Sequence, residues 1–233
     1  MARCVVALAR ETDFLADMKQ LVIFDLDGTL LNTIADLAEA VNRALVACGF
    51  PPHPTDAYRF FVGDGVSKLF ERALPAEARS AENIALIRTH FIPYYDAHNA
   101  DLSRPYDGIV ELLAELKSRS VRVAVASNKY QAATEKLVRH YFADTDFVAV
   151  LGQREGVAIK PSPQIIFDVL EVAGGVAPKD VLYVGDSNVD MQTGPNAGVD
   201  TVGVSWGFRP REELAAHNPV AIIDHPSELL DLL

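Results

Sequence analysis

Apolar residues fall into two alternating patterns along most of this chain. Short runs rich in Val, Ile and Leu are typical of buried strands, and segments with apolar residues three or four positions apart are typical of helices. The runs predict strands at 21–24, 121–126, 147–151, 181–184, 201–204 and 221–224. The periodic segments predict helices at 33–48, 107–119, 131–141, 164–173, 189–197 and 226–232. This alternation predicts an α/β fold, with a parallel sheet covered by helices on both faces.

One region interrupts the alternation directly after the first strand. Further helical patterns lie at 56–61, 65–74 and 81–95, and almost nothing resembles a strand before Pro105. An all-helical stretch of this kind predicts a cap subdomain inserted into the sheet domain. The expected division is a core of 18–32 and 104–233, a helical cap of 33–103, and an N-terminal extension of 1–17.

Two carboxylates end the first predicted strand, in the sequence Asp25-Leu26-Asp27-Gly28-Thr29. Open α/β sheets bind ligands at this carboxyl edge, and two acids so close together need a cation or a shared proton. With Mg²⁺ bound, Asp25 can stay ionised as a nucleophile while Asp27 donates and then removes a proton. Gly28 lets the backbone approach a phosphate closely, and Thr29 offers a hydroxyl donor.

Three more polar clusters are predicted to lie at the same edge of the sheet. Ser127 and Asn128 follow one strand and can donate to phosphoryl oxygens, and Lys160 lies on a proline-stiffened turn where it can neutralise phosphoryl charge. Asp186 ends another strand and suits direct metal ligation, whereas Asp190 suits an indirect role on the next helix. Each cluster alone is an ordinary turn, but their shared placement predicts one site.

Composition narrows the partners. The chain has 233 residues, 49% of them apolar, and a net charge of −11, which argues against nucleic acid or an anionic membrane as a partner. A phosphate substrate would then depend on a metal and a well-placed lysine. Cys4 and Cys48 lack metal-ligand or redox spacing, so we expect a reducing, cytoplasmic location. The sequence leaves the oligomeric state open.

As a set, the four motifs resemble the haloacid dehalogenase-like hydrolase superfamily, from about Lys19 to the C-terminus. The matching residues are Asp25-Leu26-Asp27-Gly28-Thr29, Ser127-Asn128, Lys160-Pro161, and Gly185-Asp186-Ser187 with Asp190. The resemblance implies a Rossmann-like core with a helical cap, Mg²⁺ dependence and an aspartyl-phosphate intermediate. The second acid, Asp27, favours phosphoryl transfer over carbon–halogen cleavage, because the dehalogenases of the superfamily lack it.

The same resemblance implies a role for each matching residue. Asp25 would attack phosphorus, and Asp27 would protonate the leaving oxygen and then activate water. Lys160 would offset phosphoryl charge. The phosphoryl oxygens would be held by Gly28, Thr29, Ser127, Asn128 and Lys160, and Mg²⁺ by Asp25, the backbone carbonyl of Asp27 and Asp186, with Asp190 supporting its waters.

Within the superfamily the chain looks most like the phosphoglycolate phosphatases, so a small phosphate ester, with phosphoglycolate first, is the expected substrate. In the cap, Lys68 and Arg72 are candidates to bind the substrate's carboxylate. The alternatives are a sugar-phosphate mutase resembling beta-phosphoglucomutase, and a generalist phosphatase or pyrophosphatase. A phosphonate hydrolase would need a Schiff-base lysine from the cap. Retention of both acids and of Lys160 argues against a silent binding module.

Overall fold

The computed structural model describes residues 19–233, so the predicted extension at 1–17 lies outside the described residues. Six parallel strands form one sheet in the order β5-β4-β1-β6-β7-β8. These strands are β1 (Leu21–Phe24), β4 (Arg122–Tyr130), β5 (Phe147–Gln153), β6 (Val181–Gly185), β7 (Asp200–Val204) and β8 (Ala221–Ile223). The first strand, β1, is central because it pairs with β4 on one side and β6 on the other.

Alternate residues of the strands serve two separate apolar cores, as the two-residue period of a strand requires. Val22 and Phe24 pack in the cluster that includes the helices on one face, and Leu21 and Ile23 pack in the cluster on the other. The first face is covered by α6 (Ile109–Ser118), α7 (Gln131–Tyr141) and the 3-10 helix η4 (Pro226–Leu232). The second face is covered by α8 (Gln164–Ala173) and α9 (Asn188–Ala197). The predicted α/β fold with both faces covered is confirmed.

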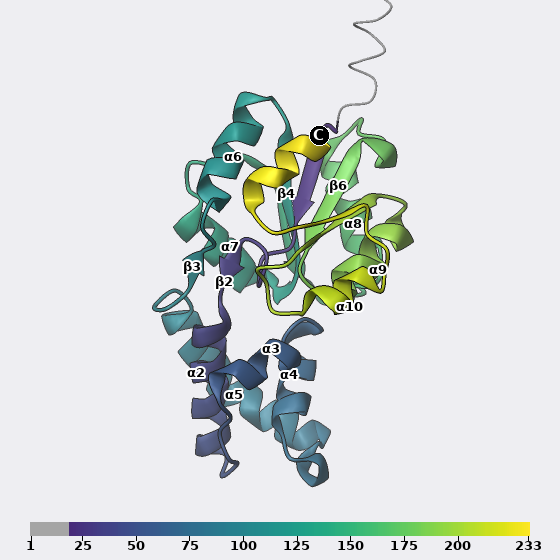
Figure 1. Cartoon of the computed structure of the whole chain (residues 1–233). Coiled ribbons are helices and arrows are strands. Elements are labelled where there is room, and N and C mark those ends of the chain that lie inside the picture. Colours follow the sequence, from purple (N-terminus) through teal and green to yellow (C-terminus); the bar gives the residue numbers. More distant parts are fainter. Residues whose placement is uncertain (1–18) are drawn as a thin grey trace, which may run out of the picture.

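A helical layer lies apart from the sheet, between the short strands β2 (Leu31–Asn32) and β3 (Arg104–Pro105) (Figure 1). Its helices are α2 (Ile34–Ala47), α3 (Tyr58–Phe61), α4 (Gly65–Ala73) and α5 (Ala81–His98), with 3-10 turns η1 (Thr55–Ala57) and η2 (Ala76–Ala78). These helices bury a third apolar cluster, to which the rest of the chain adds Ala133 and Phe208. We propose that 33–103 form a cap that packs largely on itself.

The two connections between this layer and the sheet are tied together. Strands β2 and β3 pair in antiparallel fashion, an arrangement too short for sequence periodicity to predict. Next to them, the buried carboxylate of Asp36 accepts hydrogen bonds from the backbone N–H groups of Leu102 and Ser103 and from the Ser103 hydroxyl, at 2.6–3.1 Å. The outgoing and returning segments are thereby fixed beside each other.

Two short elements complete the described chain. The 3-10 turn η3 (Pro178–Asp180) precedes β6, and α10 (Arg211–Ala215), which the hydrophobic pattern does not predict, connects β7 to β8. Over residues 19–233, none of the helices has the length and apolar character that crossing a membrane requires.

Candidate active site

The predicted site residues meet where three neighbouring strands end. Asp25 directly follows β1, Ser127 lies near the end of β4, and Asp186 directly follows β6. The strands that follow β1 in the sequence lie on both sides of it in the sheet, with β4 on one side and β6 on the other. Parallel sheets open a crevice at such a change of direction. The topology therefore places these three residues at the edge where ligands bind.

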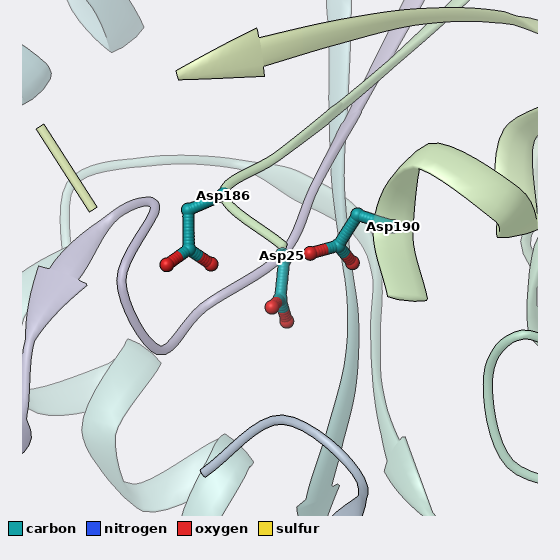
Figure 2. Close-up of side chains that lie close together, drawn as sticks. All are labelled: Asp25, Asp186 and Asp190. Atoms are coloured by element: carbon teal, nitrogen blue, oxygen red, sulfur yellow. The ribbon is translucent and has the colours of Figure 1, made fainter. Parts of the chain in front are cut away.

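Three carboxylates converge at this edge (Figure 2). Ligand oxygens of Asp25, Asp186 and Asp190 all lie within 4.8 Å of one another, and all three residues are buried. Oxygen ligands gathered at this spacing suit a hard divalent cation such as Mg²⁺. A buried group of three acids is otherwise unfavourable, because like charges repel strongly away from water.

Lys160 is the cation that the structure brings into this cluster. Its Nζ lies 3.0 Å from Asp25 Oδ1 and 2.7 Å from Asp190 Oδ1, and donates also to the Tyr183 hydroxyl and the Ala126 carbonyl. The side chain is only 2% exposed. Although burial disfavours the charged amine, the two carboxylates raise its pKa above the usual value, so Lys160 stays protonated.

Asp190 is held by more partners than the other two acids. Besides Lys160 it accepts from the hydroxyls of Tyr183 and Ser187, at 2.7 and 2.6 Å, and it forms a capping box with Ser187 at the start of α9. Burial alone would raise the pKa of Asp190, but Lys160 and these donors hold it below its usual value. Asp190 therefore remains ionised and fixes the position of Lys160.

Asp25 and Asp186 are less well compensated. Burial raises the pKa of Asp25 to about 6, because Lys160 is shared with Asp190 and Asp190 itself repels the charge. Burial together with the charges of Asp190 and Asp25 raises the pKa of Asp186 well above its usual value, although Phe208 N–H donates to it at 2.6 Å. A bound divalent cation would relieve both, so the site fits the predicted metal.

Asp27 has a different set of neighbours. Lys129 Nζ lies 2.8 and 2.9 Å from its two carboxylate oxygens, and the Thr33 hydroxyl donates to Oδ1 at 2.7 Å. The Lys129 side chain is 3% exposed, and its ammonium lies 5.0 Å from the centroid of the Tyr95 ring. Asp27 is thus bound by one residue near the end of β4 and by one at the start of the cap.

The loop between Asp25 and β2 lies close against Asp186. Gly28 has φ +87°, and a Cβ there would lie 2.2 Å from Asp186 Oδ2, so only glycine fits. The Thr29 hydroxyl is buried without a hydrogen-bond partner among the described residues, and the Trp206 indole donates to the Thr29 carbonyl at 3.1 Å. An unpartnered buried hydroxyl suits a ligand contact.

Asn128 has partners inside the protein. Its amide nitrogen donates to the carbonyls of Gly63 and Lys160, at 2.9 and 3.1 Å, and its oxygen accepts from the Lys160 N–H at 2.9 Å. Both amide hydrogens are therefore engaged, and one bond reaches the cap loop. Contact with a phosphoryl oxygen, as the sequence predicts, would require Asn128 to exchange one of these partners.

A pocket opens between this edge and the helical layer. Its polar lining comes from the sheet side and its apolar lining largely from Leu37, Val62, Val66, Leu69 and Phe91. Lys68 and Arg72, the cap residues that the sequence offers for substrate binding, do not line it. Lys68 instead pairs with Glu71 on the surface, and Arg72 pairs with Asp64.

Comparison with known proteins agrees with this geometry. The family model described as haloacid dehalogenase-like hydrolase matches residues 22–204, most of the described chain. The chain belongs to this family. This membership confirms the resemblance drawn from the four motifs, each of which falls within the matched range.

Three relatives place this haloacid dehalogenase-like hydrolase within the family. A phosphoglycolate phosphatase of Mesorhizobium japonicum is 33% identical over 210 residues, which cover 89% of this chain and 91% of the relative. An N-acetylmuramic acid 6-phosphate phosphatase of Pseudomonas aeruginosa is 33% identical over 214 residues, 91% of this chain and 93% of the relative. The crystal structure of a predicted phosphoglycolate phosphatase from Haemophilus somnus matches with TM-score 0.85 and 29% identity, over 92% of this chain and 97% of that one. The predicted enzyme class, a hydrolase of phosphate monoesters, is confirmed.

Sequence reasoning misses three residues that touch this site. Lys129, Tyr183 and Arg209 have no assigned role from the sequence, since lysine and arginine are mostly exposed and a strand tyrosine usually packs in the core. Lys129 directly follows the Ser127-Asn128 motif, so its position at a strand end is the one signal that could have identified it.

Proposed function

We propose that this hydrolase is a Mg²⁺-dependent phosphomonoesterase that works through a phosphoryl group carried on Asp25, with phosphoglycolate as its first candidate substrate. The observation that carries the proposal is the meeting of Asp25 with Lys160 and with two further buried carboxylates at one strand edge. Asp27 lies two residues beyond the nucleophile, on the turn that follows it.

Asp25 is the nucleophile in this mechanism. One of its carboxylate oxygens forms a bond to phosphorus while the bond from phosphorus to the ester oxygen breaks. Lys160, 3.0 Å from Asp25 Oδ1, limits the rotation of this carboxylate and offsets charge as the phosphoryl group arrives. The unpartnered Thr29 hydroxyl and the Ser127 hydroxyl, which lines the pocket, would donate to the phosphoryl oxygens.

Asp27 handles the proton in both half-reactions. It gives a proton to the ester oxygen as the alcohol leaves, and afterwards takes one from the water that attacks phosphorus. The bond between phosphorus and Asp25 then breaks, which releases phosphate and restores the carboxylate. Thr33 and Lys129 hold the Asp27 side chain in place.

The carboxylate cluster would hold the metal ion. Asp25 and Asp186 are its expected ligands with the backbone carbonyl of Asp27, and Asp190 would act from behind through its bonds to Lys160 and Ser187. When bound, Mg²⁺ supplies positive charge that keeps the attacking carboxylate ionised and stabilises the phosphoryl oxygens. Counted as ionised, Asp25, Asp27, Asp186 and Asp190 against Lys129 and Lys160 leave a formal charge of 2 − 4 = −2, which a divalent cation balances.

The relatives guide the choice of substrate. Their names give phosphoglycolate and N-acetylmuramic acid 6-phosphate, and both are phosphate esters of molecules that carry a carboxylic acid. The pocket of this chain combines an apolar wall from the cap with cations from the core. A small phosphate ester with a second anionic group fits this lining best.

The test is phosphate release from phosphoglycolate, hexose phosphates, nucleotides, pyrophosphate and an aryl phosphate, with Mg²⁺ and with a chelator. We expect Mg²⁺-dependent turnover and a preference for phosphoglycolate of about 100-fold in kcat/KM, which is about 2.7 kcal/mol. The Asp25→Asn protein, purified identically, is the control for contaminating phosphatases. Turnover that persists in the chelator or in Asp25→Asn would contradict the proposal.

A further inference from the structure

The cations that line the pocket come from the core. Among the described lining residues, the lysine and arginine side chains are those of Lys129 and Arg209, whereas Lys68 and Arg72 of the cap lie elsewhere. A carboxylate inside a largely apolar pocket needs a cationic partner, because a buried charge without one is strongly unfavourable. One of these two core side chains is therefore the natural partner for a second anionic group.

Lys129 has one donor to spare. A lysine ammonium carries three N–H donors, and the described residues supply acceptors for two of them, both on the Asp27 carboxylate. The ammonium lies 5.0 Å from the centroid of the Tyr95 ring, and both side chains line the pocket. A nearly fully buried donor that faces a pocket without an acceptor indicates a ligand contact.

The position of Lys129 also matches the geometry of a short substrate. Asp27 must reach the ester oxygen to protonate it, and Lys129 lies in direct contact with the Asp27 carboxylate. In phosphoglycolate a single methylene group separates the ester oxygen from the carboxyl carbon. A cation one contact away from Asp27 is thus within reach of that carboxylate.

Arg209 is engaged differently. Its guanidinium donates to the carbonyls of Val62 and Phe60, at 3.0 and 3.5 Å, and lies over the Phe60 ring with 5.4 Å to the centroid. Its Nε lies 3.7 Å from Glu213. These contacts attach residues 60–62 of the cap to the core, whereas Lys129 is the one of these two cations that bonds to Asp27.

We infer that Lys129 is the residue that selects substrates with a carboxylate next to the phosphate ester, by donating its spare N–H to that carboxylate while it holds Asp27. The inference rests on the proposed function. It assigns specificity for the second anionic group to the carboxyl end of β4 in the core, and leaves the cap to supply the apolar wall.

The experiment compares two esters in each protein sample: phosphoglycolate and its carboxamide analogue, which has the same size and no charge. In the wild type we expect kcat/KM for phosphoglycolate to exceed that for the amide by about 100-fold, as for other buried polar groups that lose their partner. In Lys129→Met we expect the ratio to fall to about three or less, because the ammonium is gone. Lys129→Arg should retain a ratio above about ten, since it keeps the charge.

The ratio of the two kcat/KM values is protected by internal and matched controls. Both rates are measured on one sample, so the folded fraction cancels, and Lys129→Gln replaces Lys129→Met if that protein does not fold. Lys68→Met is the matched control on the exposed surface of the cap, and its ratio should equal that of the wild type. Arg209→Met should lower kcat/KM for both esters by the same factor.

The outcomes separate the inference from the proposed function. If Lys129→Met slows both esters equally and leaves the ratio unchanged, Lys129 only positions Asp27 and the inference is wrong. A ratio that collapses in Arg209→Met instead assigns the carboxylate to Arg209. A wild-type protein that hydrolyses neither these esters nor any other phosphate ester with Mg²⁺ contradicts the proposed function itself.

Discussion

The carboxyl edge of the sheet and the helical cap handle charge in opposite ways. At the edge, Lys160 is buried together with Asp25 and Asp190 and bonds directly to both of them. In the cap, Lys68 with Glu71, and Arg43 with Glu39, form pairs on the surface, where the interaction contributes little. Buried charges persist only where they are paired or hold a ligand. On this contrast we propose that the chemistry takes place in the core and that the cap shapes the pocket.

The largest effect predicted from this contrast is loss of the nucleophile. Asp25→Asn should lower kcat by roughly 10⁴-fold or more, because without the carboxylate no bond to phosphorus can form. The fold should persist, since Lys160 keeps Asp190 and Tyr183 as partners. Phosphate release measures the loss, and circular dichroism checks the fold. Lys68→Met, the cap control, should leave kcat unchanged, and a comparable loss there would end the division of roles.

Removal of the proton carrier should have the next largest effect. Asp27→Asn is expected to slow turnover by about 10²- to 10⁴-fold, the usual contribution of a general acid–base group. An aryl phosphate, whose leaving group needs little protonation, should lose less in the first half-reaction. Pre-steady-state kinetics with the aryl phosphate measure this step separately. An equal loss for alkyl and aryl esters in that step would show that Asp27 does not protonate the leaving oxygen.

Metal binding at the carboxyl edge should depend on pH. Burial raises the pKa of Asp25 to about 6, and Mg²⁺ binds the ionised carboxylate, so protons compete with the metal below that pH. The apparent Mg²⁺ affinity should therefore fall at least about tenfold for each pH unit below 6, because the raised pKa of Asp186 lets a second proton compete. The thermal shift on addition of Mg²⁺ measures it. Asp186→Asn should show little shift at any pH, and a full shift there would rule out Asp186 as a ligand.

A substitution at the connections between cap and core should lower the free energy of unfolding without a large change in kcat. Asp36→Ala should lower the free energy of unfolding by about 1–3 kcal/mol, because it leaves the buried N–H and hydroxyl of Ser103, and the N–H of Leu102, without their acceptor. Denaturant unfolding measures this change. Below the melting temperature, kcat per folded molecule should remain within about twofold of the wild type. The carboxylate of Asp36 accepts its hydrogen bonds from Leu102 and Ser103, which are not part of the carboxylate cluster. A large fall in kcat would mean that the connections position the site.

The smallest effect is expected at Arg209, where the core contacts the cap. Arg209→Met removes two hydrogen bonds to the cap loop, at Val62 and Phe60, and a contact with the Phe60 ring. We expect KM to rise roughly three- to tenfold for all esters, the usual contribution of one or two such bonds, with little change in kcat. Steady-state kinetics with a charged and an uncharged ester test this. A change in kcat alone would show that Arg209 acts in the chemical step.

Much of the fold could be predicted because, along the core, the spacing of apolar residues and the length of each apolar segment indicate the same type of element. The helices at 131–141 and 164–173 have the same bounds in the structure as in the prediction, since apolar residues recur at helical spacing through both. Strand β4 continues to Tyr130, beyond the predicted end at 126, because Ser127, Asn128 and Lys129 are buried although polar. Composition cannot show that such residues stay in a strand.

The candidate site, like the fold, could be predicted only in part from the sequence. Acids at strand ends could be predicted from local sequence, because parallel strands bring their carboxyl ends to one edge. The partner of each acid could not, since Lys129 meets Asp27 across a sequence separation of 102 residues and Asn128 meets Gly63 across 65. The cap cations Lys68 and Arg72 were reasonable candidates by charge, but only the packing of α4 decides which way they face.

The most direct test of the account is to trap the phosphoryl group on Asp25. The wild-type enzyme is mixed with phosphoglycolate and Mg²⁺, quenched during the first turnover, reduced with borohydride and analysed by peptide mass spectrometry. The account predicts that the peptide containing position 25 carries the reduced residue, and that the same peptide from a reaction in chelator does not. Full turnover without any modification at Asp25, or modification at Asp27 or Asp186 instead, would contradict it.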